Sequence, residues 1–123
     1  MSEFADHLQD VFRLFGPIEV RRMFGGHGVF HHGLMFGLVS DEFLYLKADA
    51  GNLSHFEGQG LSQFVYLRQG KVMKLSYYLA PDAVMEDCAE AASWAQRSFE
   101  AALRGQATTK ASKPKPKRAG RTR

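Results

Sequence analysis

The sequence RRMFGGHGVFHHGLMFGLVSDEFLYLKAD, residues 21–49, gives the strongest indication of how this chain folds. Short apolar runs in it are separated at close intervals by glycines and polar residues. Such spacing is typical of consecutive antiparallel strands joined by tight turns. The stretch therefore predicts a β-meander, with strands at 18–23, 27–31, 34–39 and 43–47 and tight turns at 32–33 and 40–42.

Helical periodicity precedes and follows this meander. Residues 2–15 carry apolar side chains at spacings of three and four, with Ser2 as the N-cap and Gly16-Pro17 as the stop. Asp87 has capping-box spacing with a later glutamate and begins a longer helix, which we expect to close at Arg104-Gly105. The apolar stripe of that helix is expected to run through Cys88, Ala92, Ala95, Phe99 and Leu103, widened by Ala91 and Trp94.

Three further elements are expected between the meander and the C-terminal helix. They are a short helix at 52–57 capped by Asp49, a hairpin with strands at 64–67 and 72–78 that turns at Gly70, and one helical turn at 82–86 after Pro81. The sequence thus predicts a single α+β domain over residues 1–104. In it, an antiparallel sheet of about five or six strands has the N-terminal and C-terminal helices packed against it.

The composition fits one globular core. Of the 123 residues, 45% are hydrophobic and 24% are charged. No uninterrupted apolar run approaches the roughly 20 residues that a membrane-spanning helix needs. Cys88 is the single cysteine, so it can form neither an internal disulfide nor a cysteine-pair zinc site. We therefore expect a cytoplasmic protein, without membrane contact, in a reducing compartment.

The net charge of +3 is unevenly distributed along the chain. Residues 105–123 contain seven basic and no acidic groups, which leaves nine basic and all thirteen acidic groups in residues 1–104. We expect this C-terminal segment to be a disordered basic tail, because it has no large apolar residue to bury. Its candidate nucleic-acid contacts are Lys110, Lys113, Lys115, Lys117, Arg118, Arg121 and Arg123. A purely solubilising tail remains the alternative.

No residue pattern indicates catalysis or a cofactor. Gly25-Gly26-His27-Gly28 has no glycine three positions later, where His31 stands, so these glycines are expected to serve a twisted or bulged sheet. His27 and His31 share a strand face without a neighbouring third ligand, which makes them a weak metal site. Cys88 lies on the apolar stripe of its helix and is expected to be a buried, inert thiol. A small metal-binding protein or enzyme that uses His27 and His31 stays open as an alternative.

Several motifs together resemble the N-terminal domain of the TfoX/Sxy family. They are Arg21 to Gly28, Gly33 to Phe36, Leu44 to Lys47, the run 73–78 with Pro81, and Ser93-Trp94-Ala95. The likeness covers roughly residues 3–104. Full-length members carry a separate C-terminal domain, and in this chain the short basic tail stands at that place.

The resemblance implies an α+β domain of a bacterial cytoplasmic protein that regulates competence genes and DNA uptake together with a transcription-factor partner. It implies no enzyme activity. We therefore expect a non-catalytic regulatory or interaction domain that acts with a transcription factor on DNA, with a candidate partner surface at Arg21, Arg22, Lys47 and Lys74. Direct, nonspecific nucleic-acid binding through the basic tail is the second hypothesis. The sequence assigns no oligomeric state.

Overall fold

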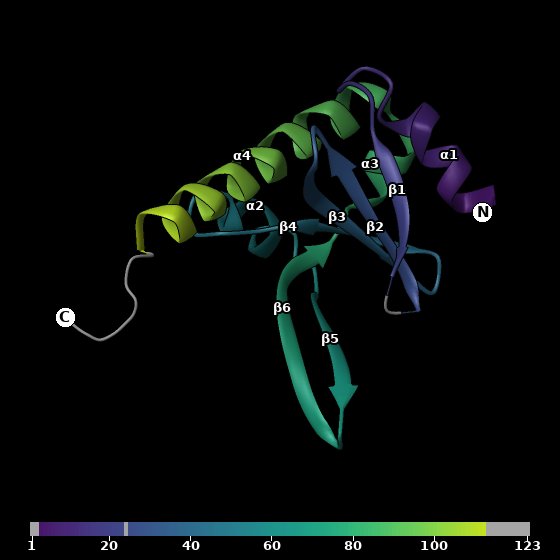
Figure 1. The fold of residues 1–123 in the computed structure, drawn as a ribbon. Helices are drawn as coiled ribbons and strands as arrows, with labels where there is room; N and C mark the ends of the chain where they lie inside the picture. Colours follow the sequence, from purple (N-terminus) through teal and green to yellow (C-terminus); the bar gives the residue numbers. More distant parts are fainter. Residues whose placement is uncertain (1–2, 24, 113–123) are drawn as a thin grey trace.

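The computed structural model of the protein describes residues 3–23 and 25–112. It shows a six-stranded antiparallel sheet with helices against one face (Figure 1). The strands stand in the order β1-β2-β3-β4-β6-β5. They are β1 (Glu19–Met23), β2 (Gly26–His31), β3 (Leu34–Ser40), β4 (Phe43–Lys47), β5 (Gln63–Arg68) and β6 (Lys71–Leu79). The helices are α1 (Glu3–Val11), α2 (Leu53–Glu57), α3 (Asp82–Glu86) and α4 (Cys88–Ser112). The predicted α+β fold is confirmed.

Three hairpins in the sheet close through two-residue turns in which both residues have positive φ. This left-handed geometry matches the twist of the flanking strands, and glycine adopts it without steric cost. The φ values are 50° and 79° at His32-Gly33, 52° and 65° at Asp41-Glu42, and 53° and 80° at Gln69-Gly70. The turns predicted at His32-Gly33 and at Gly70 are therefore confirmed.

The glycines of β2 belong to the sheet. A Cβ atom at Gly26 would collide with the carbonyl oxygen of Val39, and one at Gly28 would lie 2.6 Å from Sδ of Met23. The pairing of β2 with β3 also shifts register between Val29 and Phe30. Gly26 is thus required by close packing against backbone, and a side chain at Gly28 would displace Met23, so both glycines serve an irregular sheet, as the sequence indicated.

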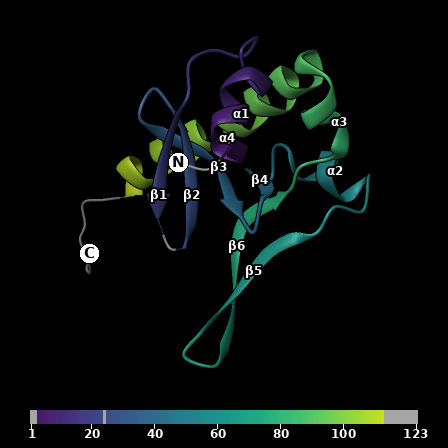
Figure 2. The ribbon, with the colours of Figure 1, turned by 90° about the vertical axis from the view of Figure 1, so that its right-hand side faces the viewer.

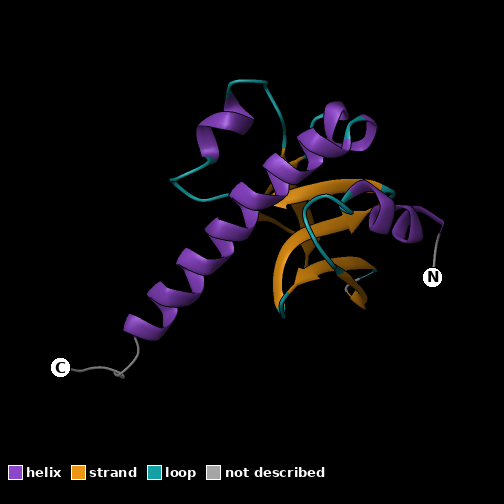
Figure 3. Ribbon diagram, turned by 90° about the horizontal axis from the view of Figure 1, so that it is seen from above, coloured by secondary structure: helices purple, strands orange, loops and turns teal. Residues whose placement is uncertain are grey.

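The core lies between the sheet and the helices α1 and α4. Leu8 and Phe12, from α1 and the turn after it, are fully buried, as are Phe36 and Leu46 from the sheet. Seen from above, α4 lies diagonally across the strands (Figure 3), and it packs on β3 and β4. Within the described residues, no helix is both long and apolar enough to cross a membrane.

The buried face of α4 differs from the predicted stripe. Its buried residues are Ala91, Trp94, Ala95, Ser98, Ala101 and Ala102. The predicted stripe members Phe99 and Leu103 are partly buried and exposed, respectively. The helix is rotated in this way because its small residues allow its backbone to approach the sheet closely, which leaves the larger Phe99 at the margin of the core.

Some predicted helix boundaries were wrong. α1 ends at Val11, and residues 12–15 form a turn, while the predicted cap Ser2 lies outside the described residues. The N-cap of α2 is Asn52 instead of Asp49. α4 does not close at Arg104-Gly105 but continues to Ser112, because an interior glycine costs a helix only about 1 kcal/mol relative to alanine. Residues 105–112 are therefore helical, and 113–123 lie outside the described residues.

The end of the β5–β6 hairpin projects from the body. Along β6, only Tyr77–Leu79 pair with β4, whereas the rest of the strand pairs with β5 alone. Figures 1 and 2 show this ribbon extending away from the helices. We call residues 63–76 the β-arm.

Candidate functional site

The four cations predicted as a partner surface lie on three different strands. β1, which carries Arg21 and Arg22, is separated by two strands from β4, which carries Lys47. Lys74 lies on β6, in the β-arm, opposite Val65. Because side chains alternate along a strand, Arg21 and Arg22 point to opposite faces of the sheet, and Lys47 points away from the buried Leu46. The structure does not gather the four residues into one patch.

Arg21 is held by its own strand and by its neighbour. Its Nε and Nη2 atoms donate to the two carboxylate oxygens of Glu19, at 3.0 and 3.1 Å. The guanidinium also lies 4.4 Å from the ring centroid of Phe30 on β2. The hydrogen bond and charge of Arg21 lower the pKa of the Glu19 carboxyl. Arg21 is thus paired with a local carboxylate, whereas Arg22, equally exposed, lies opposite His27.

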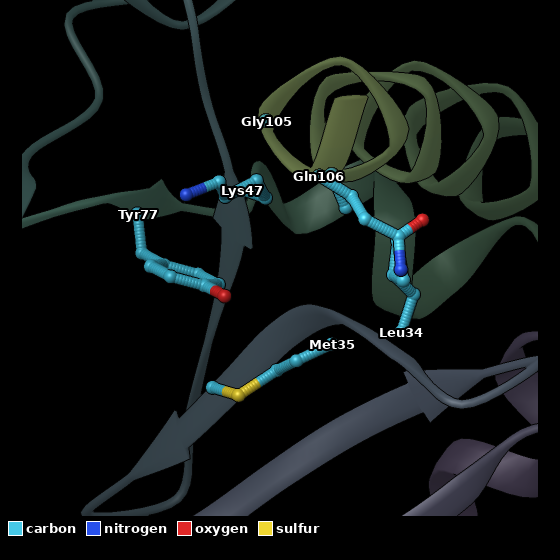
Figure 4. A pocket seen from close by; sticks show the side chains of 7 residues that line it. Leu34, Met35, Lys47, Tyr77, Gly105 and Gln106 are labelled. Atoms are coloured by element: carbon cyan, nitrogen blue, oxygen red, sulfur yellow. The ribbon is translucent and has the colours of Figure 1, made fainter. Parts of the chain in front are cut away.

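Lys47 stands at an open hollow between the sheet and the end of α4. The hollow has a volume of about 500 Å³ and is lined by Leu34, Met35, Lys47, Tyr77, Ala102, Gly105 and Gln106. Figure 4 shows Lys47 and Tyr77 together on one side, with Gln106 and Leu34 on the other. The two residues are cross-strand partners, and Nζ of Lys47 lies 5.3 Å from the Tyr77 ring centroid.

This hollow combines one cation with a neutral phenol and apolar walls. Burial raises the pKa of Tyr77 to about 12, so its hydroxyl keeps its proton near neutral pH. Among the residues that the structure describes, no carboxylate lies within ion-pair distance of Lys47. Such a surface can receive an acidic side chain against an aromatic ring. It contains no nucleophile with an adjacent base, which a catalytic site of that kind requires.

His31 is a core residue. Its ring lies 4.4 Å from the ring of Phe15 and 4.8 Å from that of Phe99, measured between centroids. Nδ1 lies 2.6 Å from the carbonyl oxygen of Pro17, so the Nδ1–H group donates to that oxygen. The imidazole therefore fixes the connection between α1 and β1. This role could not be predicted, because no local sequence pattern links His31 to Pro17.

The described residues provide no third ligand for a metal site at His27 and His31. Within residues 3–23 and 25–112, no group of three His, Cys, Asp or Glu side chains is placed to hold a metal ion. Cys88 is partly buried at the start of α4, with Sγ 3.7 Å from the carbonyl oxygen of Asp10. As expected, Asp87 caps that helix, since its Oδ1 accepts hydrogen bonds from the backbone N–H groups of Ala89 and Glu90.

Only one of the candidate nucleic-acid contacts falls in a described element. Lys110 belongs to α4. The others lie outside the described residues; they are Lys113, Lys115, Lys117, Arg118, Arg121 and Arg123. Their role remains a prediction.

Comparison with known proteins identifies a family and a relative. The family model described as the TfoX N-terminal domain matches residues 10–102. The chain is also 26% identical over 100 residues to the DNA transformation protein TfoX1 of Aliivibrio fischeri (strain ATCC 700601 / ES114). That alignment covers 81% of this chain and 48% of the relative, so the chain spans about half the relative's length. Both matches agree with the resemblance drawn from the strand motifs.

Proposed function

Because the chain belongs to the TfoX N-terminal domain family, we propose that it is a non-catalytic regulatory domain that contacts a transcription factor on DNA. The proposal follows the name of the relative TfoX1, a DNA transformation protein. It places the chain in the bacterial cytoplasm, where such a factor works. The role would be one of binding, with no chemical step.

The observation that carries the proposal is the position of Lys47. Its ammonium group lies beside the Tyr77 ring in an open hollow with apolar walls. An acidic side chain of a partner would pair there with a cation that the described part of this chain leaves without a carboxylate. A partly desolvated charge pair of this kind is worth more than a fully exposed one. Of the four predicted surface residues, Lys47 therefore supports partner binding best.

Affinity capture from the cytoplasm of the native bacterium tests this proposal. The bait is the intact chain, used with and without nuclease, and bound transcription factors are identified by mass spectrometry. We expect a transcription factor to persist after nuclease. Lys47→Glu should reduce its recovery about tenfold or more, as for other interface hot spots. Arg13→Glu, an exposed charge reversal on the turn after α1, is the matched control and should leave recovery unchanged.

Truncation separates the second candidate function, nucleic-acid binding through the tail. The cut belongs after Ser112, because a cut after Arg104 would remove Gly105 and Gln106 from the hollow and shorten α4. If recovery is lost in residues 1–112, or only after nuclease, the factor was bridged by DNA. Recovery that survives Lys47→Glu at full strength would refute the role of the hollow. The double reversal Arg21→Glu/Arg22→Glu tests the β1 part of the predicted surface in the same assay.

A further inference from the structure

The β-arm exposes apolar side chains in a part of the sheet that nothing covers among the described residues. The exposed fractions are 74% for Leu67, 64% for Val72 and 49% for Val65. Leu67 lies directly opposite Val72, and Val65 shares their face because the register pairs it with Lys74. Soluble proteins rarely leave adjoining apolar residues so exposed, and such patches mark interaction sites.

The β-arm also has a strand edge that pairs with no other strand among the described residues. β5 is the last strand of the sheet, so one of its edges has no neighbouring strand. Most of β6 pairs with β5 alone, and an isolated two-stranded ribbon is only marginally stable in water. Natural edge strands are protected by proline, charged side chains or bulges. β5 has no proline, its one charged residue, Arg68, stands at its end, and its irregular pairing lies near the body, between Gln63 and Val65.

We propose that β5 of a second copy of this chain pairs antiparallel with this edge. The two six-stranded sheets would join into one, related by a two-fold axis. Pairing of the two edges would satisfy backbone groups and bring Val65 and Leu67 of one copy against the same residues of the other. This inference is independent of the transcription-factor contact at Lys47.

The charges of the β-arm do not prevent this pairing. The arm carries Arg68, Lys71 and Lys74 and no acidic residue. Antiparallel pairing places the two copies of Arg68 at opposite ends of the interface between the two β5 strands. Lys74 lies on the inner strand, so it and its copy would be separated across the sheet by three strand spacings, about 14 Å. That exceeds the screening length of about 8 Å at physiological salt, so repulsion is weak.

Nucleic acid fits the same surface less well. The three cations would attract phosphates, but Val65, Leu67 and Val72 would then stay exposed to water or to a polar groove. A second copy covers the apolar groups and pairs the backbone edge at once. The combination of an open edge with apolar side chains therefore favours self-association.

Sedimentation velocity across a concentration series tests the proposal. We expect the intact chain to be in monomer–dimer equilibrium, and Leu67→Lys and Val65→Lys to raise the dimer dissociation constant about tenfold or more. Leu14→Lys is the matched control, because Leu14 is 62% exposed outside the β-arm. It should leave the constant unchanged, and circular dichroism verifies that every variant is folded. A chain that stays monomeric throughout would overturn the proposal, as would a dimer insensitive to both β5 variants or one that forms only with added duplex DNA.

Disulfide trapping tests the geometry. β5 spans Gln63–Arg68, so the fullest symmetric overlap is centred on Val65 or Tyr66. Opposed residues of an antiparallel pair have Cα atoms about 4.5–5.5 Å apart, within disulfide range. In a Cys88→Ser background, Val65→Cys or Tyr66→Cys should give a covalent dimer on mild oxidation, and Leu14→Cys should not. Equal cross-linking of all three would overturn the β5 pairing.

Discussion

Arg104 on α4 forms a bidentate ion pair with Asp49, which lies 55 residues earlier, in the loop after β4. Nε donates to Oδ2 and Nη2 donates to Oδ1, each at 2.7 Å. The same loop is organised by Asn52, which is buried. Its Oδ1 accepts from the Asp49 N–H group, and its Nδ2 donates to the Lys47 carbonyl oxygen. The pair therefore joins the far part of α4 to the strand that carries Lys47.

Asp49 should make the free energy of unfolding depend on pH in the acid range. Its hydrogen bond with Arg104 lowers the pKa of its carboxyl in the folded state below the ordinary value of 3.8. A lowered folded-state pKa means that the contribution to stability is present above the unfolded pKa and is lost as pH falls through the folded pKa. Asp49→Asn should therefore lower the free energy of unfolding at pH 7 and flatten its decline below about pH 4. Urea unfolding at several pH values measures this, and an unchanged acid slope would contradict it.

Gly105→Ala should stabilise the protein by about 0.5–1 kcal/mol. Gly105 is inside α4, and no atom lies within 4 Å of the Cβ that alanine would add. Alanine removes the backbone entropy cost of an interior helical glycine. The matched contrast is Gly16→Ala, which should destabilise, because Gly16 has a φ of 145° and the new Cβ would lie 3.0 Å from Cε1 of His31. Thermal unfolding distinguishes the two, and loss of stability in Gly105→Ala would mean that the helix ends at Gly105.

The strands could be predicted because their signals are local. β4 occupies Phe43–Lys47, as expected from alternation, with Leu44 and Leu46 buried. His32-Gly33 and Gly70 mark turns whose geometry depends on only two residues. The helix α4 continues beyond its predicted end. Arg104-Gly105 is a frequent helix stop signal, but the helix passes through it and ends at Ser112.

The candidate site depended on contacts that no local pattern encodes. The hollow at Lys47 requires β4, β6 and the end of α4 to meet, and the alternation of β4 predicts only that Lys47 points away from Leu46. Likewise, the apolar alternation of β5 and β6 predicts a hairpin, but not that only three residues of β6 reach β4. The exposure of Leu67 and Val72 follows from that short pairing, so only the structure could identify the β-arm.

Ser98→Ala should stabilise the protein by about 1 kcal/mol. The Ser98 side chain is completely buried in α4, and its Oγ has no hydrogen-bond partner among the described residues. A buried hydroxyl without a partner costs about 1–3 kcal/mol, part of which alanine recovers. Ser93→Ala, exposed on the same helix, controls for helix propensity and should gain no more than about 0.5 kcal/mol. Chemical denaturation compares the two, and equal gains would contradict a buried hydroxyl without a partner.

The basic tail should control any binding to DNA. If all seven cations of residues 105–123 met phosphates, the logarithm of the binding constant would fall against the logarithm of salt with a slope of about −6. Residues 1–112 keep only Lys110 of the seven. This shorter chain has ten basic and thirteen acidic residues, so it should not retard duplex DNA at low salt. Gel retardation of both chains over a salt series measures the difference.

If the binding of residues 1–112 to DNA still depended on salt, the chain would have a second DNA contact outside the tail. The β-arm holds three cations, Arg68, Lys71 and Lys74, so a slope near −3 that disappears in Arg68→Glu/Lys71→Glu would assign the binding to it. Equal retardation of duplex DNA by both chains, with the same dependence on salt, would refute the tail as the main contact. Loss of retardation on truncation, with no sequence preference in the intact chain, would instead support phosphate contacts by the tail, because such contacts carry no base readout.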